Sequence, residues 1–168
     1  MNWSERMNQT QIASWDKRFC PSYTPKEMLE MGVFEGKYLN AIKHKYPISW
    51  FTNAKLSSKP NPNINFYGVK SRLSLSHWKE NGWISEYDPL GWFEWYCNYY
   101  MGRRCPDDDR QIKRWISVVA RHGAQVTQAS KNGRLKQKQA LLQWAWNWED
   151  SPNSMMIRQQ NLERIFRS

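Results

Sequence analysis

The chain has 168 residues, a length that suits one domain. Its 25 lysines and arginines outnumber 15 acidic residues, which gives a formal net charge of +10. This balance favours polyanionic partners such as DNA, RNA or an acidic membrane surface. The 11 tryptophans, eight tyrosines and six phenylalanines provide large apolar groups for a core. The composition therefore predicts a globular chain and argues against disorder.

Two features argue against a membrane or secreted protein. No run of residues approaches the roughly 20 apolar residues that a membrane helix needs, and the first residues are too polar for a secretory signal. Cys20, Cys97 and Cys105 have no framework spacing, which favours reduced thiols. We therefore expect a cytoplasmic or nucleoid-associated protein that is not secreted and does not bind membranes.

Breaks at Cys20-Pro21-Ser22 and Ser151-Pro152-Asn153 divide the chain into three parts. Residues 1–22 are predicted to form an N-terminal arm with apolar residues at helical spacing. Residues 23–150 are predicted to form a helical core domain. Residues 151–168 are predicted to form a basic helix or a tail.

The first half of the core predicts short elements. Thr24-Pro25-Lys26-Glu27 is a capping box that should begin a helix ending at Gly32. A second helix is expected over 33–45, before Pro47. The proline- and asparagine-rich residues 57–65 predict a loop, and a short helix fits 74–81.

The second half predicts the main helices. Asp88-Pro89 should begin a helix whose aromatic residues, over 92–100, occupy all faces, which is typical of a central buried helix. A helix from Pro106-Asp107 to about His122 should turn its apolar stripe inward. Another fits 135–149. The expected fold is mainly α, a compact single-domain helical bundle with long irregular loops.

Positive charge is concentrated between residues 103 and 138, where ten cations and three acids give a net +7. A groove formed by the 103–121 helix and the 131–138 segment could neutralise successive phosphates. Trp78 and Trp83, at element ends, are candidates for stacking on a base. The predicted nucleic-acid-binding residues are these two tryptophans with Arg103, Arg104, Arg110, Lys113, Arg114, Arg121, Lys131, Arg134 and Lys136.

An acidic run beside the arginines permits a second hypothesis. Asp107, Asp108 or Glu94 could activate water, and Gln111 could position a substrate. The same carboxylates could instead cap their own helix and complement its dipole. The enzyme hypothesis would be compatible with a divalent cation. No other cofactor is indicated.

Soft metal ligands are scarce in this sequence. Cys97, Cys105 and His122 are the only ones close together along the chain, and no CxxC or HxxxH spacing occurs. We therefore predict no metal site. There is also no glycine-rich phosphate loop and no dinucleotide-binding fingerprint.

One motif carries a resemblance. It runs through Gly91-Trp92-Phe93-Glu94-Trp95-Tyr96-Cys97, Gly102-Arg103-Arg104, Asp107-Asp108, Arg110-Gln111-Ile112 and Arg114-Trp115. This pattern resembles a widespread family of proteins from bacteria, viruses and fungi that has no established activity, and the similarity extends over most of the chain. Because the family has no established activity, the resemblance implies no catalytic residues. The resemblance implies that its polar members form one unit: Glu94, Arg103, Arg104, Asp107, Asp108, Arg110, Gln111 and Arg114.

The leading hypothesis is therefore a nucleic-acid-binding domain that contacts DNA or RNA phosphates through a basic helical groove. The first alternative is an enzyme that acts on nucleic acid by base excision, base modification or strand cleavage. The second is a protein-interaction module whose basic face meets an acidic partner protein.

Overall fold

The regular structure is helical throughout the part of the chain that the computed structural model describes, residues 14–71, 80–82 and 84–150. No strand occurs among these residues, which confirms the predicted mainly α fold. The α-helices are α2 (Pro25–Met31), α4 (Trp92–Tyr100), α5 (Asp108–Val126) and α6 (Leu135–Gln143). The 3-10 helices are η2 (Lys43–Lys45), η3 (Ile48–Trp50) and η4 (Pro62–Ile64).

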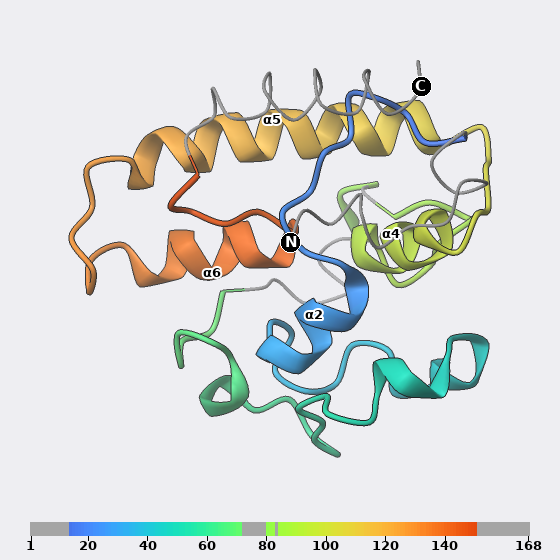
Figure 1. Ribbon diagram of the computed structural model, residues 1–168, viewed down its shortest axis with the longest axis horizontal. Coiled ribbons are helices and arrows are strands. Elements are labelled where there is room, and N and C mark those ends of the chain that lie inside the picture. Colours follow the sequence, from blue (N-terminus) through green and yellow to red (C-terminus); the bar gives the residue numbers. More distant parts are fainter. Residues whose placement is uncertain (1–13, 72–79, 83, 151–168) are drawn as a thin grey trace, which may run out of the picture.

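The longest helix, α5, organises the fold. It forms an antiparallel hairpin with α6, and in Figure 1 it runs above α6 at its carboxyl-terminal half and above α4 at its amino-terminal half. Helix α2 and the 3-10 helices lie on the side away from α5. Two indole N–H groups link α5 to the residue that follows α6 and to α4. Trp115 on α5 donates to the Trp144 carbonyl (2.7 Å), and Trp95 on α4 donates to the Asp108 carboxylate (2.8 Å).

The core is aromatic and centres on Phe19. Its ring is fully buried and lies 5.1 to 5.9 Å from five rings of α4 and α5, those of Trp92, Trp95, Tyr96, Tyr99 and Trp115. Four of these five pairs are edge-to-face, and such pairs add about 0.5–1.5 kcal/mol each beyond area burial. Trp15 stacks on Phe19 from the same segment. The described part of the predicted arm, residues 14–22, thus contributes directly to the core.

Helix α2 forms as its sequence predicts. The Thr24 hydroxyl accepts from the Glu27 N–H, and the Glu27 carboxylate accepts from the Thr24 N–H. The helix ends at Gly32, whose φ of +71° is left-handed. A Cβ at this position would overlap the Ile64 carbonyl oxygen, so the close approach of the 57–65 loop also requires glycine.

The helix expected over 33–45 is wrong, apart from the single 3-10 turn of η2. Residues 33–42 form successive turns instead. Glu35 and Gly36 have positive φ values of 56° and 81°. The Glu35 N–H donates to the Asn65 side chain (2.6 Å), and the Gly36 carbonyl accepts from Ser57. These long-range contacts override the local helical pattern.

Three other predicted helix boundaries are corrected by the structure. Helix α4 begins at Trp92 after Gly91, because Asp88 is buried in an ion pair and does not cap the helix. Helix α5 passes through Gly123 to Val126. Helix α6 ends at Gln143, because Ala145 takes φ +58° and the Trp146 N–H closes on the Leu141 carbonyl. Most of the expected 74–81 helix and all of 151–168 lie outside the described residues.

Candidate nucleic-acid interface

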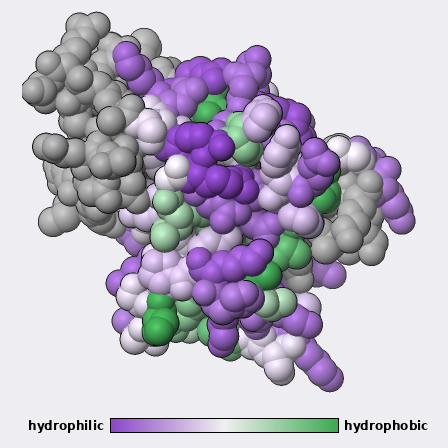
Figure 2. All heavy atoms as spheres, turned by 90° about the vertical axis from the view of Figure 1, so that its right-hand side faces the viewer, coloured by the Kyte–Doolittle hydropathy of each residue, from purple (hydrophilic) through white to green (hydrophobic). Residues whose placement is uncertain are grey.

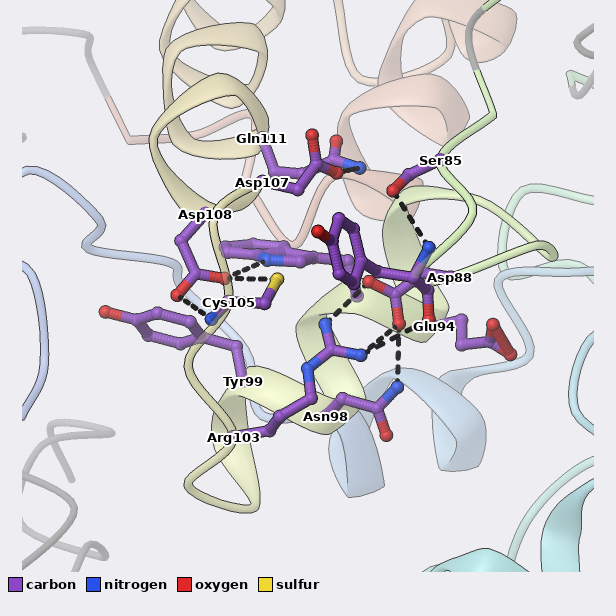
Figure 3. Close-up of polar contacts among 12 residues, drawn as sticks. Ser85, Asp88, Glu94, Asn98, Tyr99, Arg103, Cys105, Asp107, Asp108 and Gln111 are labelled. Carbon is purple, nitrogen blue, oxygen red and sulfur yellow. Dashed lines mark hydrogen bonds and ion pairs between the residues drawn. The ribbon is translucent and has the colours of Figure 1, made fainter.

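Arg103 is anchored by a buried carboxylate. Its two terminal nitrogens donate to the two oxygens of Asp88 at 2.7 and 2.6 Å, and the Asn98 amide adds a third donor at 2.8 Å (Figure 3). Asp88 is 0% exposed. The hydrogen bonds to Asp88 raise the pKa of Arg103 above its ordinary value. Arg103 therefore joins the segment before α4 to the segment after it.

Arg104 is also held internally. Its guanidinium lies 3.6 Å from the centre of the Tyr99 ring, and it donates to the carbonyls of Tyr99 and Ser14. A cation stacked on an aromatic ring and hydrogen-bonded through all three of its nitrogens ties the chain after α4 to residues 14–19. Neither Arg103 nor Arg104 presents an uncommitted guanidinium fork to solvent.

The side chains of the two predicted catalytic aspartates point in different directions. Asp107 accepts from Arg110 (2.6 Å) and Gln111 (3.0 Å). Burial opposes its ionisation, but the hydrogen bond and charge of Arg110 hold its pKa below the ordinary value. Asp108 points the other way and accepts from the Trp95 indole and the Cys105 N–H (Figure 3). Each carboxylate therefore already has several donors.

Positive charge is balanced at the amino-terminal end of α5. Arg110 pairs with Asp107, and Lys113 pairs with Asp109 at 2.8 Å. Arg114 is half-buried, donates to the Gln111 amide oxygen and lies over the Trp144 ring. Figure 2 shows this end of the molecule as a largely hydrophilic face with separate hydrophobic patches.

Unbalanced charge lies at the other end of the α5–α6 hairpin. Residues 110–148 contain eight lysines and arginines and no aspartate or glutamate. Four of these cations are exposed and form no ion pair with any described residue: Arg121, Lys131, Arg134 and Lys136. The predicted set of cations thus separates into an internally paired group and an uncommitted group.

The tertiary fold adds Lys70 to the cations that form no ion pair in the described chain. The Ser71 hydroxyl donates to the Lys136 carbonyl at 3.0 Å, which places the exposed Lys70 beside α6. We name Lys70, Arg121, Lys131, Arg134 and Lys136 the basic patch. Sequence reasoning missed Lys70, although residues 36–79 also lack any acidic residue.

A buried lysine shapes the turn that carries the patch. Lys138 is 0% exposed, and its ammonium donates to the carbonyls of Ser130 (2.6 Å) and Lys131 (3.1 Å). The same nitrogen lies 3.8 Å from the centre of the Trp148 ring. Both carbonyls belong to the α5–α6 turn, so Lys138 fixes the turn from inside and leaves Lys131 and Arg134 outside.

Arg134 occupies a conformation that favours glycine. Its φ is +56°, which costs a non-glycine residue about 1–2 kcal/mol. We expect Arg134→Gly to raise the free energy of unfolding by up to about 1 kcal/mol, because relief of strain exceeds the added entropy of the unfolded chain. Urea unfolding would measure this, with Lys131→Gly as a control for adding flexibility to the turn. A lower stability for Arg134→Gly would show that the Arg134 side chain stabilises the fold.

Glu94 has a different environment from the aspartates. It is 5% exposed, and the only hydrogen bond to its carboxylate within the described chain is a long one from the Leu90 N–H, at 3.5 Å. Burial raises the pKa of the Glu94 carboxyl above its ordinary value, and the nearby Asp88 adds to this rise. Glu94 is therefore the predicted catalytic carboxylate with the fewest donors.

Trp78 and Trp83 lie outside the described residues. Within the described ranges, no group of three or more histidine, cysteine or acidic side chains could hold a metal ion. Among the helices of those ranges, none has the length and apolar character needed to cross a membrane.

Comparisons of the chain with protein-family models, curated proteins and solved structures give no significant match. The family resemblance of its aromatic and basic motif therefore stays a prediction, and the geometry of the candidate interface is the basis for the proposed function.

Proposed function

We propose that the protein binds nucleic acid by contacting phosphates with the basic patch. The observation that carries this proposal is five exposed cations without ion-pair partners in the described chain. Four of them lie in residues 110–148, which contain no acidic residue, and Lys70 lies on the segment bonded to α6. Uncommitted lysines and arginines can neutralise phosphates and release counterions. The cations at the other end of α5 are less suited to this role, because binding would first break their existing pairs.

The test is a fluorescence-anisotropy titration of labelled single- and double-stranded DNA and RNA over a series of salt concentrations. If the five cations each neutralise one phosphate, the slope of log K against log salt should be roughly −3.5 to −4.5. Absence of binding at low salt would overturn the proposal. Binding to an acidic protein under the same conditions would then favour the protein-interaction alternative.

Glu94 supports a second candidate function, an enzyme that acts on nucleic acid. A buried carboxylate with a raised pKa keeps its proton to a higher pH than an ordinary glutamate, which suits a general acid or base. Asp107 and Asp108 support this function less, because protein donors already occupy their carboxylate oxygens. Product analysis of the binding samples, with and without magnesium and with the Glu94→Gln variant, would test it. Unaltered nucleic acid in all samples would contradict it.

The Glu94 environment also predicts a pH dependence of stability. Because the folded-state pKa of Glu94 is raised, its contribution to stability is present below the unfolded pKa and is lost as pH rises through the folded pKa. Glutamine does not ionise. We therefore expect Glu94→Gln to gain stability relative to the wild type as pH rises from about 4, the ordinary glutamate range.

Urea unfolding of both proteins between acidic and neutral pH would measure this difference. Glu30→Gln serves as the control, because Glu30 is more exposed and pairs with Lys26 on the surface. A constant difference between wild type and Glu94→Gln across this range would contradict the raised pKa.

A further inference from the structure

Phe66 is an exposed aromatic residue on a firmly held segment. Its side chain is 53% exposed, yet its backbone N–H donates to the Gly32 carbonyl at 2.9 Å. The neighbouring Tyr67 ring meets it edge-on, with the ring centres 5.0 Å apart. The Phe66 ring is thus placed by a fixed backbone and a packed neighbour while much of its surface faces solvent.

The same segment runs beside the basic patch. The Tyr67 N–H donates to the Gln139 side chain on α6 (3.0 Å), and Ser71 donates to the Lys136 carbonyl. These two contacts hold residues 66–71 against α6. Phe66 therefore shares one short anchored segment with Lys70 and lies near the helix that carries Lys136.

An exposed ring four residues from the unpaired Lys70, on a segment bonded to the helix that carries Lys136, matches the chemistry of an unpaired nucleotide. Bases stack on aromatic side chains, while lysine and arginine contact the adjoining phosphates. A phenylalanine has no polar group to hydrogen-bond a base edge, so this stacking would not depend on sequence. In a duplex each base face is already covered by its neighbours, and exposing one costs a few kcal/mol per step.

We infer that the ligand of the basic patch is single-stranded nucleic acid, and that Phe66 is the platform on which one of its bases stacks. This inference rests on the proposed function and adds the class of ligand to it. It assigns to Phe66 a role that the sequence had suggested for Trp78 and Trp83.

The test compares Phe66→Ala with the wild type on a labelled single strand and on a duplex of the same length, each over a salt series. Phe66→Ala should weaken single-strand binding by about 5- to 150-fold, the range expected for one lost stacking contact. The salt slope should not change, because no phosphate contact is removed. Duplex binding should change by less than about twofold, since no base stacks on the ring there.

Two variants control the comparison. Phe66→Trp keeps a stacking surface and should retain single-strand affinity. Tyr87→Ala removes another exposed aromatic side chain, 45% exposed and outside the basic patch, and should leave both affinities unchanged.

The outcomes separate the two proposals. No binding of the wild type to either ligand would overturn the proposed function and the inference with it. Normal wild-type binding with an unchanged single-strand affinity for Phe66→Ala would overturn only the stacking role. An equal loss on single strand and duplex would also overturn it, because that loss would reflect a disturbed patch.

Discussion

Replacing Asp88 by alanine should lower the free energy of unfolding by about 3 kcal/mol or more, the cost of breaking a buried ion pair by removing one partner. Asp88 is fully buried and accepts two hydrogen bonds from Arg103 and one from Asn98. Without the carboxylate, the guanidinium and the amide would lose an acceptor that is itself fully buried. Arg103 retains partial exposure, which places the expected loss near the lower end of the range for buried pairs.

Urea unfolding monitored by tryptophan fluorescence would measure this loss. Asp109→Ala is the matched control, because Asp109 also pairs with cations, Arg18 and Lys113, but is 56% exposed. Surface pairs are typically worth less than about 1 kcal/mol. Similar losses in the two variants would show that the Asp88–Arg103 pair does not hold the fold. A double variant with Arg103→Met should recover part of the loss, since it removes the charge left unpaired.

Sequence patterns correctly predicted the parts of the fold that depend on contacts between residues close together in the chain. The capping box at Thr24 and the apolar stripe of α5 act within one or two helical turns, and both elements form. The 33–45 prediction failed because Glu35 is bonded to Asn65, 30 residues away. A periodic pattern cannot report such a contact. Element ends fixed by positive φ values, such as that of Ala145, were missed for the same reason.

The candidate interface was only partly predictable from the sequence. Clustered charge identified the α5–α6 hairpin, but it could not distinguish a paired arginine from an unpaired one. Arg103 lies 15 residues from its carboxylate and is committed to it. Lys70 forms no ion pair in the described chain, and its neighbour Ser71 bonds to Lys136, which is 65 residues away. Pairing across such separations is a property of the tertiary structure, which is why the fold shifts the expected interface toward the carboxyl-terminal end of α5.

The basic patch itself carries the largest expected effect on binding. The triple variant Lys131→Gln, Arg134→Gln and Lys136→Gln removes three cations of the turn. If each contacts one phosphate, the salt slope should become less steep by roughly 2 to 3, and affinity at 0.1 M salt should fall roughly a hundredfold or more. The three side chains are exposed, so stability should change little.

A second triple variant separates a local patch from the effect of net charge. Lys17→Gln, Lys26→Gln and Lys113→Gln remove the same number of exposed cations, two of which pair with Glu30 and Asp109. Nearly unchanged affinity and salt slope in this variant, together with a large loss of affinity in the first, would locate the phosphate contacts on the α5–α6 turn. Equal losses in both would mean that the protein attracts nucleic acid through its overall charge of +10 and that the turn has no special role. The fixed geometry that Lys138 imposes on the turn argues for the first result, because cations held at set positions can match successive phosphates, whereas diffuse charge cannot.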